Sequence, residues 1–451
     1  MVPNIQKNST GGAPSPALIP AGLVENNLER PDNSTGAKKT SKKHCRSQSW
    51  PERSPIEPHF NVGLIIDSTH IKDTHVSAIN KPASRCQLTS LVVLNPCTTD
   101  KRIATKPTKG VLSIEDSVGK WLVANKVVGG IEHLDFVGTG QEGCDEMLRS
   151  GSIHAVYIVV PPSSQKQYIL QALNCKKHVL AIDPTSVKLP EFMEELECAK
   201  KNRKFIQTTA MFVHQYRVQR FMNHVLEDDK FGRIIEVNAS IQLCCDDVER
   251  VGVKLPLRKQ DGCIRVLGRF CVLVSTLFYN RVGSYADSAR VKSFRYGPNG
   301  EVASAHCVVN FTNDRKLNFY VAYTKNATRQ AIELKATSRY ATMNDFVIEH
   351  PDGLATYRVY DRKARCEGNM HALDCDSIDV GKGMGEDRVL WRSFVKLGHQ
   401  IDNNEGWDDN NAIAECIELT DVALQMKKIL NALMESLENG GKEVSVETFC
   451  E

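Results

Sequence analysis

The stretch from His154 to Arg217 carries the clearest pattern of apolar and polar positions in the chain. It opens with AVYIVVPP, residues 155–162, an apolar run that ends in two prolines and is typical of a strand buried on both faces of a parallel sheet. The pattern then predicts a helix, a strand, a helix and a strand at Ser163–Asn174, Lys177–Ile182, Leu189–Asn202 and Lys204–Thr209. This alternation predicts parallel pairing through right-handed crossovers, the core of a doubly wound α/β sheet.

Two further strands, Asn61–Ile66 and Thr89–Leu94, precede this stretch and would complete a Rossmann-like sheet. A dinucleotide-binding sheet needs a glycine-rich turn after its first strand, so that the backbone can approach the pyrophosphate at a helix N-terminus. The turn here has no glycine as far as His75, and the carboxylate of Asp67 would repel a phosphate. Where an acidic residue would hold the ribose hydroxyl, after the second strand, the chain has Asn95.

A GxGxxG string at residues 138–143 matches the dinucleotide fingerprint by letter but stands elsewhere in the domain. It follows a short apolar run and a helix predicted at Ser117–Val127, and it leads into a helix predicted at Glu142–Leu148. We therefore interpret its glycines as a loop and helix cap at the third strand-to-helix turn.

After Phe231 the buried runs give way to alternating apolar and polar residues. Strands are predicted at Ile234–Gln242, His306–Phe311, Leu317–Tyr323, Gln330–Ala336 and Ala355–Tyr360. Helices are predicted at Val266–Phe278, Asp387–Leu397 and Ala412–Leu437, the last one ended by two glycines. This part is predicted to be α+β, an open and mainly antiparallel sheet with a mostly apolar helix against it.

Length and composition suggest two domains and two tails. The predicted parts are a disordered tail over residues 1–58, a Rossmann-like domain over 59–210, a sheet domain over 211–447 and a short tail over 448–451. The formal net charge is only +3, which gives no basis for binding nucleic acid, and no apolar run approaches a membrane span.

Without an apolar segment at the N-terminus we expect a cytoplasmic protein, in which the 15 cysteines are reduced and mostly buried. Cys366, His371 and Cys375 lie close in sequence but fit no common zinc spacing, so we predict no metal site.

The sharpest feature of the first tail is RSQSWP, residues 46–51, in which Arg46 stands three residues before Ser49. The string suits a basophilic kinase and resembles the phosphoserine motif read by 14-3-3 proteins, with Ser49 as the phosphosite. A chance match in a tail rich in serine and arginine is the alternative.

Three segments, AVYIVVPP, KHVLAIDP and TTAMFVHQYR, resemble the dinucleotide domain of the Gfo/Idh/MocA family of glucose–fructose oxidoreductases and inositol dehydrogenases. The resemblance is nearest to the dihydrodiol and sugar dehydrogenase branch, and it extends from about Phe60 to Val446. It implies a Rossmann domain followed by a large open antiparallel sheet, and redox chemistry on sugars, polyols or diols with NAD or NADP. It also implies a homo-oligomer, a dimer or a tetramer.

The positions that carry this family's chemistry differ here. The family's Glu-Lys-Pro, whose lysine assists proton transfer, is replaced so that Asp183 stands in the lysine position, and Gln165 stands where the family favours a histidine. In the second domain Val266 occupies the family's aspartate position, and Phe270 follows at an aromatic or histidine position. Hydride transfer from an alcohol needs a base for the hydroxyl proton, and none of these residues is placed to supply one.

Other residues remain as candidates for a site. His214, Tyr216 and Arg217 are catalytic candidates because the family branch has a similar His- and Arg-containing segment, although polar caps at the domain junction are an equally open interpretation. The resemblance also leaves five candidates for contact with a cofactor: Val160, Pro161, Pro162, Asp183 and Pro184.

The sequence therefore leaves two hypotheses for function. The first is a degenerate family member, which has lost most or all dehydrogenase activity and keeps the fold for a scaffold or regulatory role. The second is an active NAD(P)-dependent oxidoreductase acting on a sugar, polyol or diol.

Overall fold

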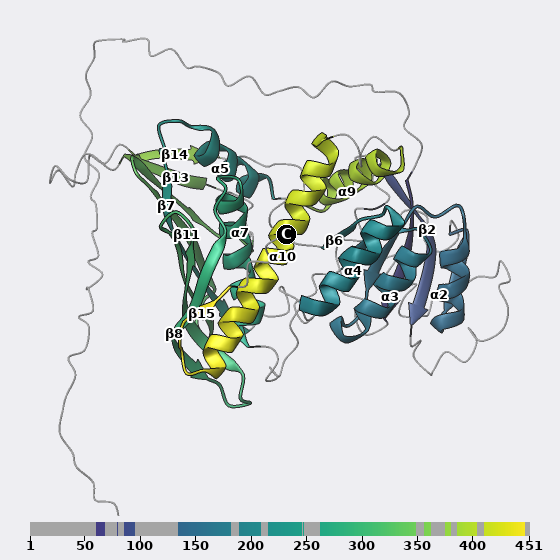
Figure 1. Ribbon diagram of the computed structural model, residues 1–451, viewed down its shortest axis with the longest axis horizontal. Coiled ribbons are helices and arrows are strands. Elements are labelled where there is room, and N and C mark those ends of the chain that lie inside the picture. Colours follow the sequence, from purple (N-terminus) through teal and green to yellow (C-terminus); the bar gives the residue numbers. More distant parts are fainter. Residues whose placement is uncertain are drawn as a thin grey trace, which may run out of the picture. The chain divides into compact units, whose positions relative to one another are not determined.

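The computed structural model describes residues 60–67, 79, 85–94, 134–181, 189–208, 215–245, 247, 262–348, 356–361, 375–379, 386–403 and 410–446. They form a parallel sheet and a larger mixed sheet, each packed against helices (Figure 1). The predicted tail over residues 1–58, the predicted helix over 117–127 and Asn95 lie outside the described residues.

The parallel sheet, called sheet A, has six strands in the order β3-β2-β1-β4-β5-β6. Its strands are β1 (Phe60–Asp67), β2 (Cys86–Leu94), β3 (Phe136–Thr139), β4 (Ala155–Val159), β5 (His178–Ala181) and β6 (Ile206–Thr208). The chain order reverses between β1 and β4, the place where open α/β sheets bind ligands at the carboxyl ends of their strands. The predicted doubly wound α/β sheet is confirmed.

Both faces of sheet A are buried, which explains the unbroken apolar runs of its strands. Its helices are α2 (Gly140–Arg149), α3 (Pro162–Asn174), α4 (Leu189–Asn202) and α9 (Glu386–Asp402). On one face, Ile65 and Ile158 share a core with apolar residues of α2, α3 and α4. On the other face, Tyr157 meets Trp391 of α9 edge to face, with the ring centroids 5.4 Å apart. The chain thus returns to sheet A after it has built the second sheet.

The second sheet, called sheet B, has nine strands in the order β14-β13-β12-β11-β7-β10-β9-β8-β15. They are β7 (Ile234–Cys244), β8 (Ala286–Tyr296), β9 (Val302–Phe311), β10 (Arg315–Thr324), β11 (Arg329–Ala336), β12 (Arg339–Asn344), β13 (Thr356–Asp361), β14 (Cys375–Asp379) and β15 (Val444–Ser445). All neighbouring pairs are antiparallel except β7 and β10, which are parallel, so the sheet is mixed and mainly antiparallel as predicted.

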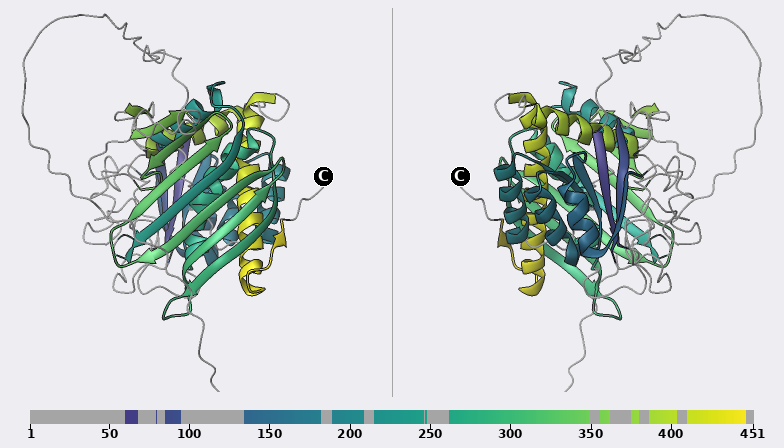
Figure 2. Two further views of the ribbon diagram at one scale, coloured as in Figure 1. Left: turned by 90° about the vertical axis from the view of Figure 1, so that its left-hand side faces the viewer. Right: turned by 90° about the vertical axis from the view of Figure 1, so that its right-hand side faces the viewer.

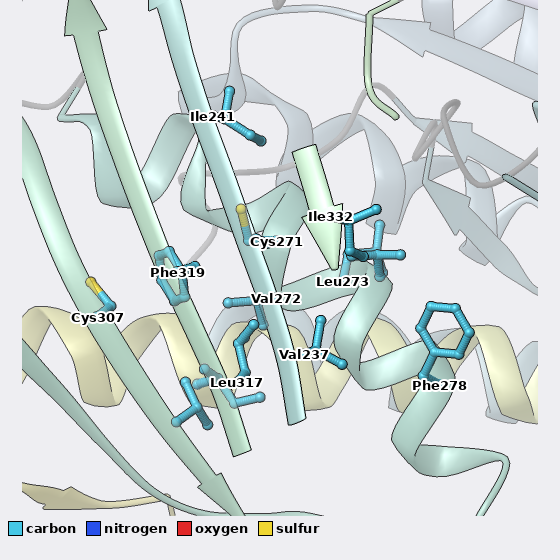
Figure 3. Close-up of a cluster of buried hydrophobic side chains, with 14 of the residues drawn as sticks. Val237, Ile241, Cys271, Val272, Leu273, Phe278, Cys307, Leu317, Phe319 and Ile332 are labelled. Carbon is cyan, nitrogen blue, oxygen red and sulfur yellow. The ribbon is translucent and has the colours of Figure 1, made fainter. Parts of the chain in front are cut away.

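One face of sheet B packs on helices and holds the largest core. The helices in this core are α5 (Tyr216–Glu227), α6 (Cys263–Val266), α7 (Gly268–Asn280) and α10 (Asn410–Glu438). Figure 3 shows side chains of β7, β9, β10 and β11, among them Val237 and Phe319, meeting Cys271, Val272 and Leu273 of α7. The prediction of an apolar helix against the sheet is confirmed.

One stretch of this core has the length and hydropathy of a membrane span, which was not predicted from the sequence. Residues 263–280 form the one stretch of the described residues that is long and apolar enough for a membrane span, and 83% of it is buried inside the protein. Burial under sheet B accounts for its composition, because a helix that is apolar on most sides suits the core of a large protein.

The opposite face of sheet B is largely polar, and no helix lies in front of it in the left view of Figure 2. On it, Asn318 donates to Glu236 at 2.7 Å, and Lys335 lies 3.6 Å from the same carboxylate. Asn238 donates to Glu333 at 3.4 Å in the neighbouring row. The contacts described on this face are polar, and oligomerisation through it stays a prediction.

The cysteines of the described residues agree with a reduced protein. The side chains of nine of them are described as free thiols, and five of these are buried. Burial raises the pKa of the thiols of Cys86, Cys263 and Cys271, which makes them inert.

Candidate functional site

The carboxyl end of β1 is the first place to look for a ligand site. Its last residue, Asp67, is buried, with 6% of its surface exposed. Burial raises the pKa of the Tyr168 phenol on α3, and the charges of Cys144 and Asp67 raise it further. The carboxylate of Asp67 is therefore close enough to act electrostatically on the helix that follows β4.

At the carboxyl end of β4, a side chain of the following helix, α3, bonds back to the turn. Gln165 of α3 is fully buried, and its Nε2 donates to the carbonyl oxygen of Val160 at 3.3 Å. The side chain of Val160 is itself 1% exposed, and Pro161 caps α3 without a side-chain hydrogen bond. The residue in the family's histidine position thus holds the turn together.

These residues do not fit the pyrophosphate of a dinucleotide. The chain has no glycine between Gly63 and Gly110, so the turn after β1 lacks the residue that allows close backbone approach. A buried carboxylate at the same strand end adds repulsion toward a phosphate. Of the five predicted cofactor contacts, Val160, Pro161 and the backbone of Pro162 are described, whereas Asp183 and Pro184 lie outside the described residues.

The GxGxxG glycines have a packing role at the turn from β3 to α2, as predicted from their place in the order. Gly140 is the first residue of α2, with a φ of +60° that favours glycine. A Cβ on Gly138 would lie 2.8 Å from the Cα of Gly143, so strand and helix can approach this closely only without side chains.

The two family positions in the second domain carry no proton-handling group. Val266 ends α6 and is 7% exposed inside the core of sheet B. Phe270 packs at the edge of that core, with the guanidinium carbon of Arg269 at 4.5 Å from its ring centroid. Val266 is therefore a core residue of sheet B.

The catalytic candidates of the FVHQYR segment are only partly described, because His214 lies outside the described residues. Tyr216 begins α5 and is 44% exposed, whereas Arg217 is 5% exposed. Between strand and helix, the Nε2 of Gln215 donates to the carbonyl oxygen of Val347 at 2.9 Å. Tyr216 acts electrostatically on Tyr357 of β13, which places its phenol near sheet B. The described contacts agree with a cap on sheet B; the catalytic role stays a prediction.

A polar cluster that the sequence did not single out lies at the opposite, amino end of sheet A. His178 is fully buried at the start of β5, and its Nε2 lies 3.0 Å from Oδ1 of Asp402 on α9. Lys204, just before β6, makes an ion pair with the same oxygen. The Nδ1 of His178 accepts from the backbone N–H of Phe205 at 3.4 Å. We call His178, Lys204 and Asp402 the amino-end network.

The charges of the amino-end network follow from burial. Burial lowers the pKa of His178 to about 4, so the imidazole is neutral at pH 7 and donates its Nε2 proton to Asp402. Burial alone would raise the pKa of the Asp402 carboxyl, but hydrogen bonds from His178 and Lys204 outweigh it and hold that pKa below its ordinary value. The network therefore pairs one anion with one cation and ties α9 to two strands.

Only part of this network could have been found from the sequence. His154 stands directly before β4 and His178 is the first residue of β5, which puts both at the amino end of a parallel sheet. The backbone N–H of Asn61 indeed donates to Nδ1 of His154 at 3.0 Å. Asp402 is 224 residues from His178 in the chain, and no local pattern links the two. Among the described residues no cluster of His, Cys, Asp or Glu could hold a metal ion.

Comparison with known proteins agrees with this fold. Residues 118–210 match the sequence profile of the Gfo/Idh/MocA family, described as an oxidoreductase family with an NAD-binding Rossmann fold. The structure is similar to an NAD-binding oxidoreductase from Klebsiella pneumoniae, with a TM-score of 0.61 and 13% identity over 86% of this chain and 99% of that one.

It is also similar to KijD10, a 3-ketoreductase from Actinomadura kijaniata solved with NADP and TDP-benzene, with a TM-score of 0.58 and 13% identity over 84% of this chain and 98% of that one. Residues 118–210 therefore resemble the Gfo/Idh/MocA family in sequence, and the two-sheet fold around them is shared with these solved structures.

Proposed function

We propose that this protein is a member of the oxidoreductase family that no longer carries out the family's hydride transfer and keeps the fold for a scaffold or regulatory role. The observation that carries the proposal is the buried Asp67 at the carboxyl end of β1, on a chain with no glycine in the turn that follows. A dinucleotide needs an electropositive, closely approachable turn at that point.

The substituted family positions support the same conclusion. Gln165 bonds to the backbone of Val160, and Val266 is packed in the core of sheet B. Asp183 adds a negative charge where the family has a lysine. Neither Gln165 nor Val266 can act as the base that takes the proton of a substrate hydroxyl as hydride leaves.

The first experiment is a calorimetric titration of the full-length protein with NAD, NADH, NADP and NADPH. We expect no binding tighter than about millimolar, which is a free energy of about −4 kcal/mol. Low-micromolar affinity for any of the four would contradict the proposal. KijD10 itself is a suitable positive control, because its structure contains NADP.

An active NAD(P)-dependent oxidoreductase for a sugar, polyol or diol is the second candidate. It is supported by the NAD-binding description of the family and by the NADP in KijD10. Absorbance at the nicotinamide band, followed with panels of sugars, polyols and diols, tests it directly. Turnover by the unmodified protein would establish this candidate and remove the first.

The role without catalysis would depend on partners. We propose a cytoplasmic homo-oligomer, a dimer or tetramer, whose mass in light scattering would exceed the 50.3 kDa of a monomer. A species of monomer mass at working concentration would contradict it.

The partner proposed for the N-terminal tail is a 14-3-3 protein that binds phosphorylated Ser49. A peptide over residues 42–55, with and without phosphate on Ser49, would be titrated against a 14-3-3 protein. Equal binding of both forms would leave RSQSWP a chance string.

A further inference from the structure

The edge of sheet B at β8 is paired over only part of its length. β15 is two residues long and pairs with Ser288 and Ala289 alone. One step further, the backbone N–H of Val291 donates to Oγ of Ser436 on α10 at 3.0 Å. From Lys292 to Tyr296, no described residue pairs with β8 on the side away from β9. A strand in this situation offers unpaired backbone donors and acceptors.

All five side chains of this free segment are exposed, including two aromatic ones. Phe294 is 37% exposed and Tyr296 is 54% exposed, and their rings meet edge to face with centroids 5.4 Å apart. Phe294 lies opposite Ala305, and Tyr296 lies opposite Val302. Because both partners belong to the core under sheet B, the aromatic pair continues the apolar face of the sheet beyond its helices.

The same segment is strongly basic. Arg290, Lys292 and Arg295 are exposed, and no acidic residue stands between Arg290 and Tyr296. Arg295 lies opposite Ser304 and Arg290 opposite Val308, so these two cations face away from the aromatic pair. Burial lowers the pKa of His306 on β9, and the charge of Lys292 lowers it further, which shows that the positive field extends over the neighbouring strand.

We propose that the free edge of β8 from Lys292 to Tyr296 binds an extended acidic polypeptide segment, which adds to sheet B as a further strand. Main-chain hydrogen bonds to the free edge would supply affinity for any extended chain. Alternate side chains of the added strand would face the aromatic pair on one side and the cations on the other. Carboxylates beside Lys292 and Arg295 would then select the partner.

Edge protection is the competing explanation for these charges. Cations and bulges keep edge strands from pairing with copies of themselves, and β8 has register shifts after Val291 and after Arg295. Like charges repel a second copy of this chain but attract an acidic partner, so protection and selective docking use the same residues. Protection does not account for Phe294 and Tyr296, because exposed aromatic side chains promote association.

The test is fluorescence anisotropy with the full-length protein and a short, labelled peptide of alternating glutamate and valine. Two matched peptides serve as controls, one with lysine in place of glutamate and one with proline in place of alternate valines, which cannot pair as a strand. We expect only the glutamate–valine peptide to bind, and we expect its binding to protect the amides of Lys292–Tyr296 from hydrogen exchange.

Variants of exposed residues separate the two parts of the site. Lys292→Glu with Arg295→Glu should weaken binding by about tenfold or more, and Phe294→Ser with Tyr296→Ser should weaken it similarly. Lys200→Glu with Lys201→Glu, at exposed positions on α4, is the matched charge control and should bind as the parent does. Circular dichroism should show unchanged folding, since all of these side chains are exposed.

Three outcomes would overturn the proposal. One is equal binding of the proline peptide, which would show charge attraction without strand addition. Another is undiminished binding by the charge-reversed variant. The third is tighter binding of a single-stranded oligonucleotide than of the acidic peptide at the same edge, since basic and aromatic residues together also suit nucleic acid.

Discussion

The two ends of the strands of sheet A differ in how their polar residues are used. At the amino ends, His178 and Lys204 from two strand starts converge on one carboxylate of α9. At the carboxyl ends, where related folds bind their ligands, Asp67 is buried and Gln165 bonds back to the turn that precedes it. The paired polar side chains of sheet A thus lie at the amino ends of its strands, where they tie α9 to the sheet.

The two ends also differ in what they contribute to the fold. The amino-end network stabilises the packing of α9 against sheet A, so its loss should lower the free energy of unfolding. Val266, in the second domain, contributes apolar packing to the core of sheet B.

The largest expected effect comes from trying to restore the family's aspartate. Val266→Asp would place a carboxylate in the core of sheet B and should destabilise the protein by about 3–5 kcal/mol, because a buried charge without a partner is costly. Chemical denaturation would measure this, with Val266→Ala as the control for lost volume. A stable Val266→Asp protein that gains dehydrogenase activity would show that this position faces a catalytic site and is not simply a core position.

Removing the imidazole at the amino ends should be the next largest effect. His178→Ala should cost about 2–4 kcal/mol, since it deletes a buried ring 4.8 Å from Phe205 and leaves Asp402 with one partner. Gln165→Ala, at the carboxyl ends, loses the 3.3 Å hydrogen bond to Val160 and a smaller buried side-chain volume, and should cost less, about 1–2 kcal/mol. Chemical denaturation would give the loss of stability in each variant. Equal losses would mean that the two ends of sheet A contribute equally to the stability of the fold.

A pH titration sharpens the same comparison. His178 has its pKa lowered to about 4, so its stabilising contribution is present above its ordinary value of 6.5 and is lost as pH falls. Between pH 6.5 and 5 this amounts to about 2 kcal/mol, at about 1.4 kcal/mol per unit. His178→Gln, which keeps an N–H donor, should remove this loss. An unchanged pH slope in His178→Gln would show that the imidazole does not titrate on unfolding.

Glu195 of α4 should give a slope of the opposite sign. It is fully buried, neither carboxylate oxygen has a hydrogen-bond partner among the described residues, and burial raises its pKa to about 7. A raised acid pKa contributes stability at low pH that is lost as pH rises from 4.5 to 7, by at most about 3 kcal/mol. Glu195→Gln should therefore be less sensitive to a rise in pH than the parent protein, as thermal melts at several pH values would show.

The smallest expected effect is on cofactor binding. Asp67→Asn removes one charge at the carboxyl end of β1 and should tighten NADP binding by no more than about tenfold, because the missing glycines are not restored. Calorimetry with parent and variant measures the difference, and Lys200→Glu on α4 is a control for net charge. A much larger gain would mean that Asp67 alone blocks the site.

The fold was predictable because its periodicities are local. The runs at residues 155–162 and 177–182 are buried on both faces in sheet A, and the alternating segments of sheet B follow the period of a half-buried sheet. β8 was missed because its second half is exposed on both faces and reads as a polar loop. The parallel pairing of β10 with β7 was also missed, since no local pattern encodes which strands become neighbours.

The candidate site was less accessible from the sequence. Substitutions at Gln165 and Val266 could be identified by their place in the family's motifs, but not that the first bonds to Val160 and the second joins the core. The amino-end network depends on Asp402, which reaches sheet A only because α9 packs there. Such contacts arise from tertiary packing across more than 200 residues of chain.

The position of α9 also has a consequence for how the protein is made. Trp391 and Phe394 complete one face of sheet A, yet they are translated after nearly all of sheet B. On the ribosome, the nascent first sheet would expose Phe60 and Tyr157 until α9 has emerged. We therefore expect a gene fragment that stops before α9 to yield a product that aggregates through this uncovered face.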